Sequence, residues 1–149
     1  MDSQYYTPDV SEFFVGFEYE EKSSGLWTKQ VYNDKSPILT GQWFDGHTYM
    51  YNTIEQYIQQ EIIRVKYLDR EDIESLGFFY YRGVKETGSQ GMLLSNKLTF
   101  TKKKNFYLVF DTVNREVIIE KLTSNEQFFK GFIKNKSQLV KVLEMLDIE

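Results

Sequence analysis

Residues 92–122, MLLSNKLTFTKKKNFYLVFDTVNREVIIEKL, carry the pattern that decides the fold class. Three apolar-rich segments, 92–101, 106–111 and 116–122, are separated by short polar connections. Short segments rich in aromatic and β-branched residues, joined by polar turns, are typical of neighbouring antiparallel strands. The stretch therefore predicts a meander of strands, and Phe128 to Ile133 predicts another strand after it.

Further strand-like segments precede this stretch. Residues 14–20 predict a first strand, in which Phe17 and Tyr19 share one face while Glu18 and Glu20 share the other. Asp45-Gly46 suits a type I′ turn in a tight hairpin. The remaining expected strands are Leu26–Tyr32, the two arms of that hairpin at 42–44 and 47–49, Ile63–Tyr67 and Phe78–Arg82.

Three helices are expected, because capping patterns precede three segments with helical periodicity. Asp69 is a good N-cap for a helix from Arg70 to Leu76, and Gly77 is placed to end it. The other two helices follow Asn52 with Glu55 and, at the C-terminus, Asn135 with Gln138, where Leu139, Val142, Leu143 and Leu146 make an amphipathic stripe.

The predicted fold class is α+β. Strands that come in hairpin-like pairs, without regular strand–helix alternation, favour a mostly antiparallel sheet with helices packed on one face. How strongly that sheet curls is left open by the sequence. Residues 1–149 contain no repeat, low-complexity tract or linker, so we expect a single domain.

Composition excludes several classes of function. The chain has no Cys, which removes disulfides, thiolate zinc sites and Cys nucleophiles, and its net charge of −4 argues against a generic duplex-binding protein. The run Lys102-Lys103-Lys104 is interpreted as a solvated hairpin loop. Met1 to Tyr6 has neither a basic start nor an apolar stretch, so we expect no signal peptide, no membrane partner and a cytoplasmic location.

Catalytic and metal-binding patterns are weak. His47 is the single His, so a catalytic triad or a His-based metal site has at most one member. Residues 83–89 superficially resemble a phosphate-binding loop, but Ser89 stands where that motif needs Lys. The pair Glu18 and Glu20 could serve acid–base chemistry, although a solvated strand face explains both. We therefore expect neither a cofactor nor a metal.

Aromatic residues make up 17% of the chain, and its Tyr residues outnumber what a core readily accepts, since each buried hydroxyl needs a partner. Some rings are therefore expected at a surface or pocket, where cations could join them to meet phosphate. Arg64 and Lys66 alternate onto one strand face; an ordinary exposed sheet face is the alternative. The candidate ligand-binding residues are Trp43, His47, Arg64, Lys66 and Arg82.

Three parts of the chain resemble short uncharacterised accessory proteins of tailed bacteriophages. The similar segments are Tyr6-Thr7-Pro8 with Phe14–Glu20, Val65–Asp69 with Asp72–Phe78, and Lys130-Gly131-Phe132 with Lys134–Ser137 and a Leu-rich helix; residues 25–62 look peculiar to this chain. The resemblance implies a counter-defence factor acting in the host cytoplasm. It carries over no catalytic residues.

These observations lead to one leading hypothesis and two alternatives. The leading hypothesis is a non-catalytic binding protein that sequesters a small nucleotide-derived signalling molecule, such as an ADP-ribose derivative or a cyclic nucleotide. One alternative is an inhibitor that blocks a host defence protein through exposed Tyr and Trp side chains. The other is a hydrolase that uses Glu18 and Glu20. A homodimer is the default expectation for oligomeric state.

Overall fold

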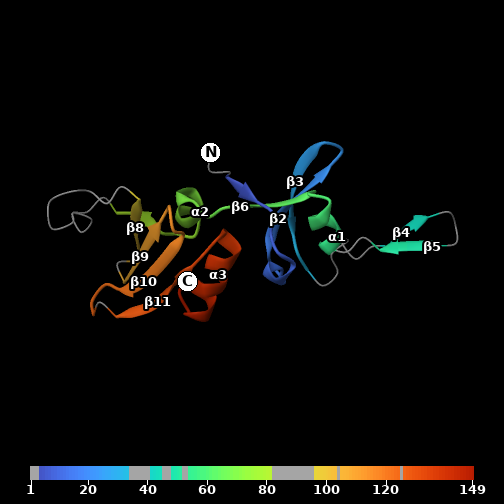
Figure 1. Ribbon diagram of the computed structural model, residues 1–149. Helices are drawn as coiled ribbons and strands as arrows, with labels where there is room; N and C mark the ends of the chain where they lie inside the picture. Colours follow the sequence, from blue (N-terminus) through green and yellow to red (C-terminus); the bar gives the residue numbers. More distant parts are fainter. Residues whose placement is uncertain are drawn as a thin grey trace. The chain divides into compact units, whose positions relative to one another are not determined.

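The protein is described by a computed structural model in which residues 4–33, 41–44, 48–51, 54–81, 96–103, 105–124 and 126–149 are placed, with the backbone alone for 41–44 and 48–51. The chain divides into two compact units, Met1–Tyr67 and Leu68–Glu149. Figure 1 shows the helices and strands of each unit. The expectation that both units form a single domain stays a prediction.

The first unit is built on a four-stranded sheet in the order β1-β6-β2-β3. All neighbours in it are antiparallel. Its elements are β1 (Tyr5–Tyr6), the 3₁₀ helix η1 (Val10–Glu12), β2 (Glu18–Ser23), β3 (Leu26–Val31), α1 (Ile54–Gln59) and β6 (Ile63–Lys66). The separate hairpin of β4 (Gly41–Phe44) and β5 (Thr48–Tyr51) is confirmed, but it pairs Phe44 with Thr48, whereas the two-residue turn predicted at Asp45-Gly46 would pair Phe44 with His47.

One face of this sheet forms the core of the first unit. Phe17, Tyr19, Ile63 and Val65 are buried together, and Ile54 and Tyr57 of α1 pack against them. The alternation predicted for residues 14–20 therefore holds at Phe17 and Tyr19. The strand itself begins later than expected, at Glu18, because Gly16 has a φ of +94° and the Phe17 N–H bonds back to the Phe14 carbonyl in a turn.

The second unit is built on a five-stranded antiparallel sheet in the order β11-β10-β9-β8-β7. Its elements are α2 (Arg70–Ser75), β7 (Phe79–Tyr80), β8 (Lys97–Lys102), β9 (Phe106–Asp111), β10 (Glu116–Lys121), β11 (Gln127–Phe132) and α3 (Lys136–Met145). The predicted meander is confirmed as β8, β9 and β10. The predicted α+β class with antiparallel sheets is confirmed, although the strands divide between two sheets and a hairpin.

Both helices of the second unit pack on the same face of its sheet. Ile73 of α2 and Leu139 of α3 share a buried cluster with strand residues such as Phe100, Leu108 and Val117. The helix starts follow the capping predictions, since the Asp69 carboxylate accepts from the Asp72 N–H, and the Asn135 side chain accepts from the Gln138 N–H, at 2.9 Å each. Gly77 follows α2 with a φ of +84°, the left-handed conformation that ends helices.

The lysine run at the end of β8 departs from its prediction as a solvated loop. Lys102 is only 9% exposed, and its Nζ donates to the Leu76 carbonyl at 2.9 Å and lies over the Phe78 ring. Alternation in β8 explains the burial, because Lys102 shares a strand face with core residue Phe100. Lys103 is exposed with a φ of +49°, and Lys104 lies outside the described residues.

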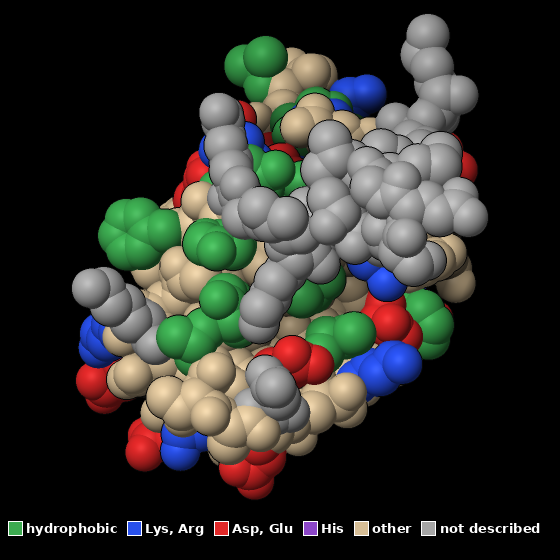
Figure 2. Space-filling view, turned by 90° about the vertical axis from the view of Figure 1, so that its left-hand side faces the viewer, with side chains coloured by type: hydrophobic (Ala, Val, Ile, Leu, Met, Phe, Trp, Pro, Cys, Tyr) green, Lys and Arg blue, Asp and Glu red, His purple; other side chains and the backbone are tan. Residues whose placement is uncertain are grey.

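The other face of the second sheet carries apolar side chains. Phe79 in β7 and Phe132 in β11 lie on the face away from the helices and are 72% and 74% exposed. Figure 2 shows apolar side chains gathered on the surface of this unit. None of the helices in the described part of the chain has the length and hydrophobicity that a membrane crossing needs.

Candidate functional site

Two of the five predicted ligand-binding residues have described side chains. Arg64 and Lys66 both lie in β6, are half-buried, and point to the same side of the sheet, as their spacing predicts. The backbone of Trp43 is in β4, but its side chain lies outside the described residues. His47 and Arg82 also lie outside them, so their predicted roles stay predictions.

The strand registers assemble a larger set of side chains around Arg64 and Lys66. Arg64 is directly opposite Glu20, Lys66 is opposite Tyr5, and Lys22 is opposite Trp27. Side chains opposite each other in an antiparallel pair lie on the same face. The residues on this face, which we call the basic–aromatic face, are Tyr5, Glu18, Glu20, Lys22, Trp27, Lys29, Val31, Arg64 and Lys66.

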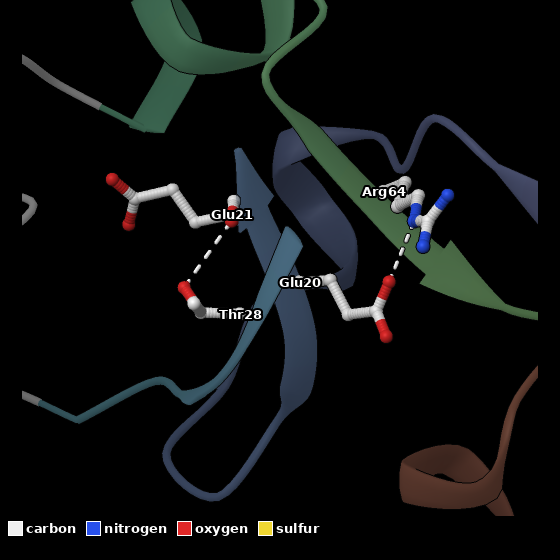
Figure 3. A network of polar contacts seen from close by, with 4 residues as sticks. All are labelled: Glu20, Glu21, Thr28 and Arg64. Atoms are coloured by element: carbon white, nitrogen blue, oxygen red, sulfur yellow. Dashed lines mark hydrogen bonds and ion pairs between the residues drawn. The ribbon is translucent and has the colours of Figure 1, made fainter. Parts of the chain in front are cut away.

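Among the described elements of this unit, α1 does not cover the basic–aromatic face, because it packs on the opposite, core face of the sheet. Figure 3 shows the division between the two faces: Glu20 and Arg64 point to one side of the strands, while Glu21 and Thr28 point to the other. Lys22 and Lys29 are exposed, and Tyr5 and Trp27 are half-buried. Two rings and several cations are thus presented together.

Arg64 is the centre of this face. Its guanidinium carbon lies 3.8 Å from the Tyr5 ring centroid and 4.2 Å from the Trp27 ring centroid. Its Nε donates to Glu20 Oε2 at 2.6 Å (Figure 3). Two rings and a carboxylate fix the side chain in one orientation, since an Arg over aromatic rings gains cation–π energy and the ion pair adds a directed hydrogen bond.

The remaining N–H donors of Arg64 make this face suitable for binding an anion. Among the described residues, Nε–H is the guanidinium donor that forms a hydrogen bond. The ion pair drawn in Figure 3 uses Nε, and the two terminal nitrogens are not part of it. A guanidinium presents its donors in a rigid planar fork, which matches two oxygens of a phosphate or carboxylate. The guanidinium of Arg64 is therefore already oriented to bind an additional anion.

The charge of the basic–aromatic face is opposite to that of the whole chain. Lys22, Lys29, Arg64 and Lys66 face two carboxylates, so the face carries a net charge of +2 in a chain of net charge −4. Lys22 Nζ also lies 5.8 Å from the Trp27 ring centroid. A local positive surface in an acidic protein attracts anions selectively to that place.

The two carboxylates of this face, Glu18 and Glu20, have different surroundings. Glu18 is exposed, as expected for a solvated strand face, but the Glu20 side chain is only 17% exposed and engages Arg64, which corrects that expectation for Glu20. The Oε2 atom of Glu20 already accepts a hydrogen bond from Arg64 Nε at 2.6 Å. Within the described residues, no group of three or more His, Asp or Glu side chains is arranged to hold a metal.

Sequence reasoning did not identify Tyr5, Trp27, Lys22 or Lys29 as site residues. Three of these lie in β2 and β3, where two-residue alternation places them on the face of Glu18 and Glu20, so a signal was present. No pattern in the sequence indicated Tyr5 as a site residue, because β1 has only two residues and lies in a polar N-terminal segment.

Two buried charged groups of the second unit have structural partners. Burial lowers the pKa of the Lys102 ammonium below its ordinary value, and nearby Lys103 acts in the same direction. The Asp111 carboxylate accepts the N–H groups of Asn114 and Val113 at 2.9 Å each, and these bonds hold its pKa below the ordinary value. Asp111 closes the β9–β10 turn, and Lys102 bonds to the end of α2.

The basic–aromatic face therefore has the composition of an anion-binding and ring-stacking surface. It is formed from four strands and lies opposite the core of the first unit. The resemblance to phage accessory proteins is a separate prediction that the geometry of this face does not address. Comparison of the chain with family models, with curated proteins and with solved structures found no match.

Proposed function

We propose that the protein sequesters a small nucleotide-derived molecule on the basic–aromatic face without altering it chemically. The observation that carries this proposal is the position of Arg64, held between Tyr5 and Trp27 and fixed by Glu20. A nucleotide needs a cation for its phosphate and a flat apolar surface for its base. Arg64 supplies such a cation, and the adjacent rings of Tyr5 and Trp27 supply such a surface.

Approximate energies support useful affinity. Stacking of a base on an aromatic side chain contributes roughly 1–3 kcal/mol, and each hydrogen bond between a phosphate oxygen and a charged donor adds about 1.5–3 kcal/mol. Because Arg64 is already oriented, less side-chain entropy is lost when a ligand binds. A few such contacts can give a dissociation constant in the micromolar range, which corresponds to a binding free energy of about −8 kcal/mol.

The biological role that fits this activity is counter-defence in a phage-infected cell, where removal of a nucleotide-derived immune signal protects the phage. This role is supported by the resemblance of the N-terminal, central and C-terminal segments to phage accessory proteins. A binding role without catalysis is supported by the engagement of Glu20 with Arg64, which removes one of the two carboxylates a hydrolase would use.

Isothermal titration calorimetry against a panel of nucleotides, including cyclic nucleotides and ADP-ribose, tests the proposal. Saturable binding is expected, and heating the complex should release the ligand intact, whereas a hydrolysed product would indicate an enzyme. Trp27→Leu should weaken binding by about 1–3 kcal/mol. Flat titrations across the panel at high protein concentration would refute the proposal.

A matched pair of lysine variants separates local from general charge effects. Lys29 and Lys121 are both exposed strand lysines, but only Lys29 lies on the basic–aromatic face. Lys29→Gln should weaken ligand binding, and Lys121→Gln should leave it unchanged although both remove one positive charge. Equal effects of the two variants would show that binding reflects net charge and not this face.

A protein-interaction inhibitor is the second candidate function. It is favoured by Phe79 and Phe132, two large apolar side chains exposed on one face of the second sheet. Exposed aromatic side chains commonly anchor protein interfaces. Affinity capture from infected cells distinguishes the two candidates, since a stoichiometric protein partner with no small molecule released on denaturation would favour the inhibitor.

A further inference from the structure

We infer that the basic–aromatic face binds a short single-stranded oligonucleotide more tightly than a mononucleotide. This inference rests on the proposed function and specifies its ligand class. It follows from three properties of the face: its rings lie close together, its cations are spread over several strands, and it lies on the side of the sheet opposite the core that α1 covers.

The two rings can serve more than one base. Their centroids lie 3.8 and 4.2 Å from the guanidinium carbon of Arg64, so the two rings are at most 8.0 Å apart. Tyr5 and Trp27 are both half-buried, so part of each side chain is exposed to solvent. A mononucleotide has one base and can stack on one ring, whereas neighbouring bases of a strand can use both.

The cations are dispersed instead of converging on a point. Lys66 lies in β6 next to Tyr5, Lys22 lies in β2, and Lys29 lies in β3. Strands of a sheet are about 4.8 Å apart, so Lys66 and Lys29 start from backbones roughly 10 Å apart. One phosphate can contact one or two of these side chains. A chain of successive phosphates can contact all of them.

The location of these side chains on a sheet face supports the same ligand class. Sites for small ligands are usually concave and converge a few polar groups on one molecule. Single-stranded nucleic acids are instead bound on sheet surfaces where aromatic side chains stack the bases and basic side chains follow the backbone. The basic–aromatic face, formed across the order β1-β6-β2-β3, has this second arrangement.

A double helix fits this face poorly. Its bases are paired and stacked on each other, so Tyr5 and Trp27 could not reach their ring surfaces. Duplex binding also depends on many phosphate contacts, while the face offers a net charge of +2 within a chain of net charge −4. Unpaired bases are therefore part of the inference.

Fluorescence anisotropy of the full chain with fluorescein-labelled uridine and thymidine oligomers of about eight nucleotides, close to common site sizes for single strands, tests the inference. Unlabelled mononucleotide and a duplex of the same length serve as competitors. The oligomer should bind about tenfold or more tighter than the mononucleotide, from one additional stacked base. A preference for the RNA or the DNA oligomer also supports the inference and identifies the source of the strand.

Salt dependence provides a second measurement. The logarithm of the binding constant should fall with the logarithm of salt concentration with a slope of about −2 to −3, since each phosphate contact in a single strand contributes about −0.7. Lys29→Gln should reduce this slope by about 0.7, and Lys121→Gln should not change it. A slope near zero would contradict contacts to several phosphates.

The outcomes separate this inference from the proposed function. Equal affinity for the mononucleotide and the oligomer, or tighter binding of the duplex, would overturn the inference and leave nucleotide binding on this face intact. No binding of any nucleotide, by a protein whose far-ultraviolet circular dichroism shows folded β structure, would overturn both. Weaker oligomer binding by Lys29→Gln but not by Lys121→Gln would support both.

Discussion

Replacement of Asp111 should destabilise the second unit in a graded and pH-dependent way. The Asp111 side chain is buried, and its Oδ1 accepts the Val113 and Asn114 N–H groups at 2.9 Å each. Its Oδ2 is 3.2 Å from the Asn114 side-chain nitrogen and 3.3 Å from the Asn96 side-chain nitrogen. The carboxylate thus organises the whole β9–β10 turn.

The magnitude follows from these contacts. A hydrogen bond to a charged group contributes about 1.5–3 kcal/mol, but residues 112–114 are exposed, so water can replace part of what is lost. Asp111→Ala should therefore lower the free energy of unfolding by about 2–3 kcal/mol. Asp111→Asn keeps an oxygen for both backbone N–H groups and loses the charge, so about 1 kcal/mol is expected.

The pH dependence has a definite sign. Backbone N–H groups, that of Asn114 foremost, hold the folded-state pKa of Asp111 below its ordinary value of 3.8. The unfolded state therefore binds the proton more readily, and the stabilisation is complete above pH about 4 and is lost as pH falls through the folded-state pKa. The difference between the wild type and Asp111→Asn should shrink at low pH.

Urea denaturation followed by far-ultraviolet circular dichroism, at pH 7 and again at pH 3, measures both effects. Tryptophan fluorescence would not suffice, because both Trp residues precede residue 67 and so belong to the first unit. An Asp111→Ala cost below about 0.5 kcal/mol, the range of ordinary surface changes, would refute the structural role. A wild-type advantage over Asp111→Asn that is the same at both pH values would refute the electrostatic part.

Three further predictions concern helix ends and cooperativity. Gly77→Ala should cost about 1 kcal/mol in urea denaturation, because its φ of +84° is unfavourable for a side chain while the added Cβ would meet only ordinary contacts. Asn135→Ala should cost about 1–2 kcal/mol, and Asn135→Asp less, because only the latter keeps an N-cap oxygen for α3. If the chain is a single domain, unfolding curves from Trp fluorescence, which reports on Trp27 and Trp43, and from circular dichroism should coincide; separate midpoints would show two domains.

Local patterns were sufficient to predict most of the secondary structure. β9 has the predicted bounds, Phe106–Asp111, because its continuous run of aromatic and aliphatic residues lies between two polar turns. α2 begins where Asp69 predicts, since a side-chain oxygen there satisfies a backbone N–H that the helix cannot. The first strand was placed too early because Phe14 and Val15 are residue types typical of strands, although the positive φ of Gly16 interrupts the extended backbone.

The division into two sheets could not be predicted in the same way. Pairing between distant strands depends on which registers bury the most apolar surface, and this is a property of the assembled chain. β6 pairs with β2 through Glu20 and Arg64, which are far apart in the sequence, and β1 joins through two residues only. Neither pairing has a signature in a window of neighbouring residues.

The residues of the candidate site also depend on strand pairings that the sequence does not reveal. Alternation alone put Arg64 and Lys66 on one face, and the structure places them there. It could not show that Arg64 would meet Trp27 from β3 and Tyr5 from β1, because those contacts require three strand pairings at once. Aromatic content therefore indicated a ring-lined surface, while the identity of the rings depended on the strand order.

Arg64 has a double role that determines how the binding hypothesis is best tested. Its contacts with Tyr5, Glu20 and Trp27 connect β1, β2 and β3 to β6, so they contribute to the order of the sheet as well as to the proposed ligand surface. Arg64→Ala would leave Glu20 half-buried without its cation and would remove two cation–π contacts, at a cost of about 2–3 kcal/mol. Lost binding in that variant would not distinguish a missing phosphate contact from a disordered sheet. Lys29 avoids the problem, because its exposed side chain can change the charge of the face while the contacts that assemble the face remain.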